Sequence, residues 1–336
     1  MSSAVSAAVV GATGYGGAEL VSLLHRHPSF TPEYLTSRSY IGEAFSSVYP
    51  RFKGSIDRPC EELDTSRLDE HDIVFFALPH GKSMEIVQDI DLSSTRVVDL
   101  AADYRLRSAT EFETVYDTTH TDETNLEKAT FGLTEYFKES IANSDLVACP
   151  GCYVTASLVP LYPLAEEGLL NEPIFIDAKS GVSGAGRSPS EANTFVNCND
   201  NIRPYNVAQH RHAAEISQVL EDAGGTQEFS FVPHVNAMDH GIEAAIYLQA
   251  TSPEQANRIT AFLESTCSAH DALRYHDEPP GVKSVVKTPH CDISTVADDD
   301  RVIVFSTLDN LWKGAASQAI QNANVMFGRP NMDGLV

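Results

Sequence analysis

The chain has 336 residues, and its 23 basic residues against 47 acidic ones give a formal net charge of −24. Such an excess of acid argues against a nucleic-acid binder, which needs a basic face to displace counterions. No apolar run approaches the roughly 20 residues that span a bilayer, and the first residues lack the basic and apolar segments of a signal peptide. We therefore expect a cytoplasmic protein of about two domains.

The 6 cysteines are scattered, and only Cys149 and Cys152 lie close together in the chain. This distribution argues against a disulfide framework. A Cys-x-x-Cys pair can supply half of a zinc site, but no second pair follows at the spacing of a zinc finger or ribbon. We therefore expect no bound metal.

A glycine-rich turn lies between a β-like run at residues 4–10 and a helical pattern at residues 18–24. Its sequence, Gly11-Ala12-Thr13-Gly14-Tyr15-Gly16-Gly17, is a G-x-x-G-x-x-G variant of the dinucleotide fingerprint. Glycines let the backbone approach a pyrophosphate, which then lies at the helix N-terminus. A turn without a ligand is the alternative. The pattern predicts a Rossmann domain with five cofactor contacts in this turn: Gly11, Thr13, Gly14, Tyr15 and Gly16.

The next β-like run ends at Ser37-Arg38-Ser39. Domains specific for NAD carry an acid near this position for the ribose 2′-hydroxyl, whereas an arginine accommodates a 2′-phosphate. Hydroxyl groups and a guanidinium without an acid favour NADP(H), with Ser37 and Arg38 as contacts. A solvated surface charge is the alternative for Arg38.

Two apolar runs, residues 73–78 and 97–100, are typical of parallel strands covered on both faces. The pattern between them predicts a helix over residues 82–90. The first leads into Pro79-His80-Gly81, and the second leads into a segment that ends at Arg105. Ligands gather at the carboxyl ends of the strands in a doubly wound sheet. We therefore expect Pro79 near the cofactor and Arg105 as a clamp for a phosphate or carboxylate.

The motif at the centre of the chain is Cys149-Pro150-Gly151-Cys152-Tyr153-Val154-Thr155-Ala156, between apolar residues 146–148 and 157–164. This pattern predicts a strand end, a tight turn and the first turn of a helix. Near a helix N-terminus, N–H groups and the macrodipole favour the thiolate form of a cysteine. A small buried hydrophobe is the alternative. We interpret Cys152 as a nucleophile.

The second half has strand-like runs at residues 174–178, 229–232, 241–250 and 302–305 with fewer helices between them. This arrangement predicts an α+β domain with a more antiparallel sheet. Lys179 to Arg187 is a glycine- and serine-rich loop with a basic residue at each end. Such a loop can wrap a cofactor or phosphate through backbone N–H groups, although a flexible surface loop is the alternative.

The cluster His210-Arg211-His212-Ala213-Ala214-Glu215 supplies acid/base candidates. A cysteine nucleophile needs a positioned acid or base, and histidine titrates in the useful range. A nearby carboxylate orients an imidazole. A lone histidine would be a core or surface residue, but this dense cluster favours a catalytic role.

Together the motifs resemble the N-acetyl-γ-glutamyl-phosphate reductases, the arginine-biosynthesis members of the aspartate-semialdehyde dehydrogenase superfamily. The resemblance covers nearly the whole chain and depends on five motifs in order: Gly11–Gly17, Pro150–Tyr153, Ser180–Arg187, His210–His212 with Glu215, and Asp309–Gly314. It implies an α/β fold with an N-terminal Rossmann-type doubly wound parallel sheet and a C-terminal α+β catalytic and oligomerisation domain. The expected domains are 1–148, joined by the C-terminal helix 312–336, and 149–311.

The resemblance also implies the reaction, which is NADPH-dependent reductive dephosphorylation of N-acetyl-γ-glutamyl phosphate to N-acetyl-glutamate semialdehyde with release of inorganic phosphate. Cys152 would form a thioester, with His210 preferred over His212 as acid/base and Glu215 as the orienting group. Ser180, Gly184 and Asn310 would lie near the nicotinamide. Three basic residues would contact the substrate: Arg105, Arg187 and Lys313. A homodimer or homotetramer is expected.

Three positions depart from the family pattern: Cys149, Ala214 and His240. Cys149 stands where a small polar residue is usual, and it either packs or pairs with Cys152 under oxidation. His240 stands where arginine is expected, which puts one anion contact in doubt, and Ala214 replaces a common proline without expected consequence.

Other functions stay open at this level. The same chemistry on a carrier-protein-bound glutamyl or aminoadipyl phosphate, or on aspartyl phosphate, is one alternative, although Pro150-Gly151-Cys152-Tyr153 favours the free metabolite. A thiol oxidoreductase would use Cys149 and Cys152 but would leave the glycine turn unexplained. An NADP-sensing scaffold would have no need of Cys152.

Overall fold

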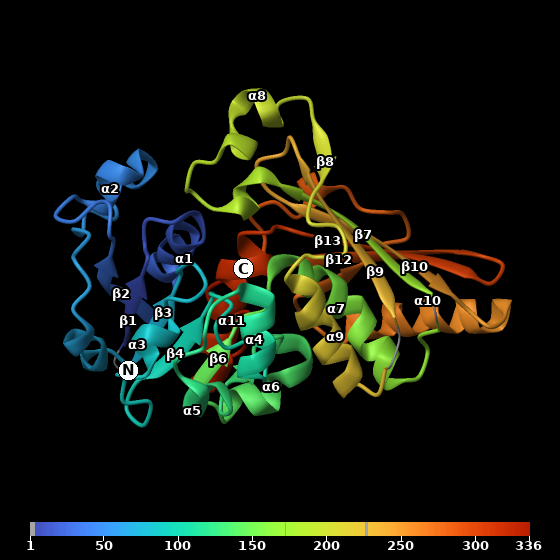
Figure 1. Cartoon of the computed structure of the whole chain (residues 1–336), viewed down its shortest axis with the longest axis horizontal. Helices are drawn as coiled ribbons and strands as arrows, with labels where there is room; N and C mark the ends of the chain where they lie inside the picture. The colour runs from blue at the N-terminus through green and yellow to red at the C-terminus, as the bar shows by residue number, and fades with distance from the viewer. Residues whose placement is uncertain (1–3, 172, 226–227) are drawn as a thin grey trace. The chain divides into compact units, whose positions relative to one another are not determined.

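The computed structural model describes residues 4–171, 173–225 and 228–336. The chain forms two compact units, one made of Met1–Pro150 with Ala315–Val336 and the other of Gly151–Gly314 (Figure 1). Each unit is built around its own sheet. The α/β fold class predicted from the sequence is confirmed, with a parallel sheet in the first unit and a mixed sheet in the second.

The described part of the first unit contains a parallel sheet with strand order β2-β1-β3-β4-β6-β5. The apolar run at residues 73–78 contains β3. All residues of this strand are buried, as expected for a strand covered on both faces. The strand bounds are β1 (Val5–Val10), β2 (Phe30–Thr36), β3 (Ile73–Phe76), β4 (Arg96–Asp99), β5 (Thr130–Phe131) and β6 (Leu146–Ala148).

Helices flank this sheet, and the last helix of the chain belongs to the same unit. Every residue of α11 is buried, and it contacts α6, α1 and β4. The helix predicted over residues 82–90 is wrong in length, because only Met84–Val87 is helical. The helices are α1 (Tyr15–Arg26), α2 (Phe45–Val48), α3 (Met84–Val87), α4 (Ala109–Tyr116), α5 (Glu123–Leu126), α6 (Thr134–Ala142) and α11 (Ser317–Met326).

The second unit has a sheet with strand order β11-β12-β13-β10-β7-β9-β8. The pairs β7/β9 and β11/β12 are parallel and the other neighbours are antiparallel, which confirms the predicted change of sheet type. The strands are β7 (Ile174–Gly181), β8 (Ile202–Pro204), β9 (Phe229–Asn236), β10 (Ile242–Gln249), β11 (Leu273–Tyr275), β12 (Cys291–Asp298) and β13 (Arg301–Leu308).

One face of this second sheet is covered by helices, and the other carries exposed side chains. The helices are α7 (Cys152–Glu166), α8 (Phe195–Cys198), α9 (His212–Asp222) and α10 (Pro253–Ser268). Among these, α7 and α10 pack on the strands. Phe175 and Tyr247 face each other across β7 and β10, and they are 48% and 42% exposed. Their neighbours along the strands are buried, because successive side chains point to opposite faces.

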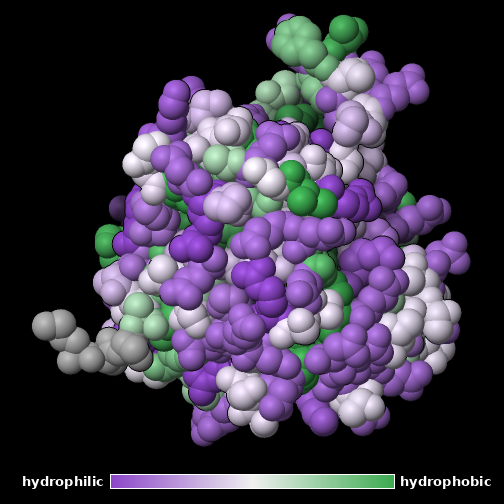
Figure 2. All heavy atoms as spheres, turned by 90° about the vertical axis from the view of Figure 1, so that its left-hand side faces the viewer, coloured by the Kyte–Doolittle hydropathy of each residue, from purple (hydrophilic) through white to green (hydrophobic). Residues whose placement is uncertain are grey.

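Shorter helical turns connect these elements. They are 3₁₀ turns at Pro50–Phe52, Thr65–Glu70, Val182–Ala185, Glu191–Asn193 and Val282–Ser284, and a π-helical turn at Trp312–Ala316. In the part of the chain that the structure describes, no helix has the length and apolar character to cross a bilayer. The face shown in Figure 2 is predominantly hydrophilic, in keeping with the net charge of −24.

Candidate active site

Cys152 is the first residue of α7, as the turn motif predicted. The N-cap residue is Gly151, whose backbone is extended, and no side chain caps the helix. Exposed N–H groups and the macrodipole at such a terminus favour the thiolate. A Cβ atom added at Gly314 would lie 2.8 Å from the Cβ of Cys152, so glycine at that position leaves room for the cysteine.

His212 and Glu215 both reach the turn before Cys152. The backbone N–H of Gly151 donates to Oε2 of Glu215 over 3.0 Å, and the Glu215 side chain is fully buried. A Cβ atom at Gly151 would lie 2.3 Å from Nε2 of His212, so the imidazole lies directly on the glycine backbone. The other carboxylate oxygen of Glu215 lies 4.0 Å from the same nitrogen. Three residues apart at the start of α9, the two side chains share one helix face.

His210 has a different environment, enclosed by rings. Its ring centroid lies 5.6 Å from that of Tyr153, 5.3 Å from Tyr205, 5.4 Å from Phe231 and 4.6 Å from His212. Its Nδ1 accepts a hydrogen bond from the backbone N–H of His212. Burial, aided by the nearby positive charges of His212 and Arg211, lowers the pKa of His210 to about 3. A neutral, enclosed imidazole is a poor proton donor near neutral pH.

The glycine- and serine-rich loop meets the motif that ends the second unit. Nδ2 of Asn310 donates to Oγ of Ser183 over 3.0 Å, and Oδ1 of Asn310 accepts from the N–H of Gly241 over 2.7 Å. A Cβ atom at Gly184 would lie 3.1 Å from Oγ of Ser180 and 3.5 Å from Nδ2 of Asn310. The structure therefore brings together Ser180, Gly184 and Asn310, which lie in two separate sequence motifs.

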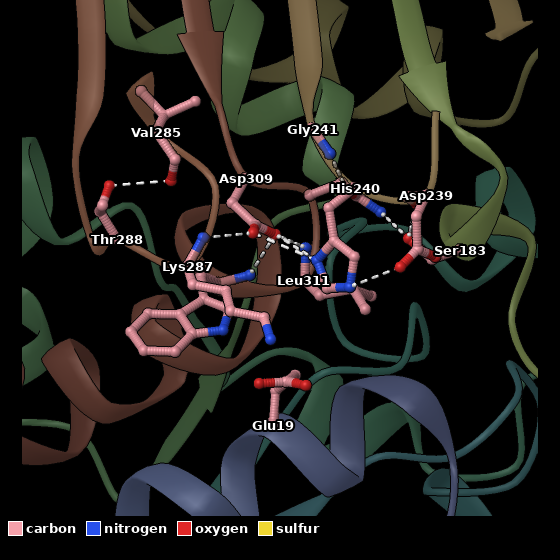
Figure 3. Close-up of polar contacts among 12 residues, drawn as sticks. Glu19, Ser183, Asp239, His240, Gly241, Val285, Lys287, Thr288, Asp309 and Leu311 are labelled. Carbon is pink, nitrogen blue, oxygen red and sulfur yellow. Dashed lines mark hydrogen bonds and ion pairs between the residues drawn. The ribbon is translucent and has the colours of Figure 1, made fainter. Parts of the chain in front are cut away.

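Asp309 is the residue of this region that sequence reasoning missed. Its carboxylate is fully buried and accepts hydrogen bonds from the backbone N–H groups of Leu311, Trp312 and Lys287. Nδ1 of His240 lies 3.2 Å from its Oδ2 (Figure 3). His240 thus faces a buried carboxylate, not an open anion site. The Asp309–Gly314 motif gave no role for this acid, because Lys287 and His240, two of its partners, come from segments far away in the sequence.

The chain immediately after Asp309 forms the π-helical turn. The N–H of Gly314 donates to the carbonyl of Asp309, five residues back, and this register is what places Gly314 against Cys152. Such turns are frequent at functional sites. Lys313 within the turn is completely buried. Its role in substrate binding, like that of the half-buried Arg187, stays a prediction.

The glycine turn in the first unit has the close packing that a phosphate cradle requires. Gly11 has a φ of +89°, and a Cβ atom there would lie 2.4 Å from the carbonyl oxygen of Ala77. Gly14 is the N-cap of α1, without a side-chain cap, and at Gly16 a Cβ atom would meet nothing within 4 Å. The N-terminus of α1 is therefore open for a phosphate group.

The remaining predicted residues of this unit lie at the carboxyl ends of neighbouring strands. Oγ1 of Thr13 and Oγ of Ser37 are 2.7 Å apart, and Arg38 beside them is exposed. Pro79 is exposed after β3, and Arg105 follows β4 with its Nη2 donating to the carbonyl of Leu100. No group of three metal-ligating side chains occurs among the residues described.

Comparison with known proteins identifies the family. The model of the semialdehyde dehydrogenase NAD binding domain matches residues 6–144, and that of the semialdehyde dehydrogenase dimerisation domain matches residues 152–310. The N-acetyl-gamma-glutamyl-phosphate reductase of Desulforudis audaxviator is 43% identical, covering 99% of this chain and 98% of its own. The reductase of Desulforamulus reducens is 42% identical over 97% and 96%.

The chain belongs to the N-acetyl-gamma-glutamyl-phosphate reductase family. It is therefore an oxidoreductase of the semialdehyde dehydrogenase type, and its first unit is a nicotinamide-nucleotide-binding domain.

Solved structures confirm the fold of this reductase. Aspartate semialdehyde dehydrogenase II of Vibrio cholerae superposes with a TM-score of 0.72 at 18% identity, covering 97% of this chain and 99% of its own. The Candida albicans aspartate semialdehyde dehydrogenase with NADP gives a TM-score of 0.69 at 18% identity, covering 97% and 99%. At such identities the likeness establishes the fold alone.

Proposed function

We propose that the chain catalyses the NADPH-dependent reductive dephosphorylation of N-acetyl-γ-glutamyl phosphate to N-acetyl-glutamate semialdehyde through a thioester on Cys152. The observation that carries this proposal is the position of Cys152 at the uncapped N-terminus of α7, one residue after the glycine that contacts both His212 and Glu215. A helix N-terminus activates the thiolate and supplies N–H donors where an oxyanion develops.

The proposed first half-reaction transfers the acyl group to sulfur. The thiolate of Cys152 attacks the acyl carbon, so that the S–C bond forms, the C–O bond to phosphate breaks, and inorganic phosphate leaves. The leaving oxygen takes a proton from His212, whose Nε2 faces Glu215. An acyl phosphate already has a good leaving group, so the site mainly has to hold the thiolate, the oxyanion donors and the carbonyl in line.

The second half-reaction reduces the thioester. NADPH supplies the hydride when it is bound. The resulting thiohemiacetal collapses as its oxygen re-forms the carbonyl, and the S–C bond electrons return to Cys152 as thiolate. The aldehyde leaves, and the site is restored after His212 takes up a proton from solvent.

We assign the acid/base role to His212 and not to His210, which was preferred from the sequence. The His212 ring lies on the Gly151 backbone beside the nucleophile, whereas His210 is enclosed by Tyr153, Tyr205 and Phe231. Burial lowers the pKa of His210 to about 3, so it is rarely protonated at neutral pH. In this proposal His210 supports the site by accepting the His212 backbone N–H.

We propose NADP(H) as the cofactor, held in the first unit by Gly11, Thr13, Gly14, Tyr15 and Gly16. The exposed Arg38 and the adjacent Ser37 support a 2′-phosphate over a bare ribose. Pro79, Ser180, Gly184 and Asn310 remain proposed cofactor contacts. Arg105, Arg187 and Lys313 remain the proposed contacts of the substrate's anionic groups.

We further propose that the chain acts in the cytoplasm as a homo-oligomer, and that its domains correspond to the two compact units. The second unit matches a dimerisation-domain model. On its open sheet face, Tyr247 is the β-ladder partner of Phe175 on one side and of Ile303 on the other. This row of apolar side chains is a surface for a second copy.

None of the cysteines described forms a disulfide, as a reducing compartment requires.

An assay in the oxidative direction tests the proposed function. We expect NADP⁺ reduction with N-acetyl-glutamate semialdehyde only when inorganic phosphate is present, and we expect Cys152→Ala to lower the rate by about 10³-fold or more. Activity of native protein with aspartate semialdehyde or a carrier-bound substrate instead would overturn the substrate assignment. Phosphate-independent turnover would overturn the acyl-phosphate mechanism.

A further inference from the structure

Two buried carboxyl groups meet at one hydroxyl group in the first unit. Asp99 is the last residue of β4, Asp103 lies in the loop that follows, and Ser83 precedes α3. All three side chains have no exposed surface. Oγ of Ser83 lies 2.7 Å from Oδ2 of Asp99 and 2.9 Å from Oδ2 of Asp103.

The single hydroxyl proton of Ser83 cannot make hydrogen bonds to two ionised carboxylates at once. The Ser83 hydroxyl has one proton and can donate to one of the two oxygens, so the other contact needs a proton on a carboxyl group. Asp103 also accepts from the N–H groups of Gly81 and Met84, over 2.6 Å and 3.1 Å. Asp99 accepts from one further N–H, that of Ala101 over 2.9 Å. Asp103 has more hydrogen-bond donors to stabilise a negative charge, so we place the negative charge on Asp103 and the proton on Asp99.

The charges around the cluster agree with this placement. Burial raises the pKa of Asp99 to about 7, and the charge of Asp103 adds to the shift, against the hydrogen bonds from Ser83 and Ala101 and the charge of Arg105. The Tyr104 hydroxyl donates to Asp122, and Nε2 of His120 lies 2.8 Å from the Asp103 carbonyl. The side chains of Tyr104, Asp122 and His120 therefore make these contacts and not contacts with the carboxyl groups of Asp99 and Asp103.

The cluster ties together the two loops that leave β3 and β4. Through Gly81 and Met84, Asp103 fixes the loop that contains Pro79, and through Ala101, Asp99 fixes the start of the segment that contains Arg105. Both loops lie at the carboxyl edge of the parallel sheet, where ligands gather.

We propose that Asp99 is a neutral carboxylic acid that donates its proton to Ser83, while Ser83 donates to ionised Asp103, and that this chain of hydrogen bonds positions the loops bearing Pro79 and Arg105. The three residues are positioning residues and need not touch the substrate. The kinetic consequence depends on the proposed function, whereas the protonation state does not.

Infrared difference spectroscopy tests the protonation state without any assay of activity. We expect wild-type protein to show the carbonyl stretch of a neutral carboxylic acid that is lost as the pH rises through about 7. Asp99→Asn should remove this band, while the exposed Asp89→Asn control should keep it. Absence of the band in wild-type protein, or its persistence in Asp99→Asn, would overturn the proposal.

Kinetics then test positioning. Asp99→Asn keeps an acceptor for Ala101 and an N–H donor for Ser83 but has no proton to lose, so above about pH 7 its kcat/KM should fall less than that of wild-type protein. Asp103→Asn removes the negative charge that accepts three hydrogen bonds. Because the loops are then held less firmly, this variant should raise the substrate KM by about tenfold or more. Equal pH profiles for wild type and Asp99→Asn, or an unaltered KM in a folded Asp103→Asn, would contradict it. A wild-type protein without reductase activity would instead refute the proposed function, with the infrared result still decisive here.

Discussion

At the scale of single residues, the structure gives different surroundings to two histidines, His210 and His212, that look equivalent in the sequence. His212 lies on the backbone beside Cys152 and faces the buried Glu215, while His210 is packed among aromatic rings. The sequence motif places both near the nucleophile but carries no information on which ring faces it. That choice depends on Tyr153, Tyr205 and Phe231, which come from separate parts of the chain.

The matched variants His212→Asn and His210→Asn test this separation. We expect His212→Asn to lower kcat/KM by about 10²- to 10⁴-fold, because it removes the proton donor to the leaving phosphate. His210→Asn should cost less in rate and more in stability, roughly 1–3 kcal/mol, because it takes a ring from a buried cage. Steady-state kinetics and thermal unfolding measure the two effects. A larger kinetic loss in His210→Asn with stability unaltered would return the acid/base role to His210.

At the scale of elements, Asp309 connects segments that are distant in the chain. Its carboxylate holds the N–H of Lys287, which has a left-handed φ of 58°, and faces the imidazole of His240. The adjacent Asn310 is held at both ends of its amide by Ser183 and Gly241. These bonds fix the register of the π-helical turn that brings Gly314 to Cys152.

The substitution Gly314→Ala tests the importance of that register. The added Cβ atom would lie 2.8 Å from the Cβ of Cys152, so either the turn or the thiol must shift. Because a misplacement of about 1 Å costs on the order of 10²-fold in rate, we expect kcat to fall by about tenfold to 10²-fold. Gly281→Ala is the control, because a Cβ atom there meets nothing within 4 Å. Equal kcat values in the two variants would mean that the turn does not position the nucleophile.

Local patterns predicted the elements whose signals lie within a few residues. The glycine turn before α1 and the start of α7 at Cys152 are of this kind. The expected helix over residues 82–90 begins later, at Met84, because Asp103 takes the N–H groups of Gly81 and Met84, and it ends earlier, at Val87. Strand β12 was missed, because buried Asp292 and Ser294 interrupt its apolar pattern.

At the scale of the whole molecule, two kinds of sheet serve different tasks. The parallel sheet collects the glycine turn and the loops after β3 and β4 at one edge, where we propose that the dinucleotide binds. The mixed sheet carries the helix with Cys152 on one face and exposes Phe175 and Tyr247 on the other. Composition gives the net charge of −24, but it holds no information on this open face, which depends on strand order.

The central claim is that Cys152 carries the acyl group, and intact-protein mass spectrometry tests it most directly. Protein incubated with N-acetyl-γ-glutamyl phosphate in the absence of nucleotide should gain the mass of one acyl group on Cys152 and release an equivalent of phosphate. Addition of NADPH should remove the adduct as aldehyde forms, and Cys152→Ala should show neither event. Full turnover by wild-type protein without any adduct on Cys152, or turnover by Cys152→Ala at the wild-type rate, would contradict the account.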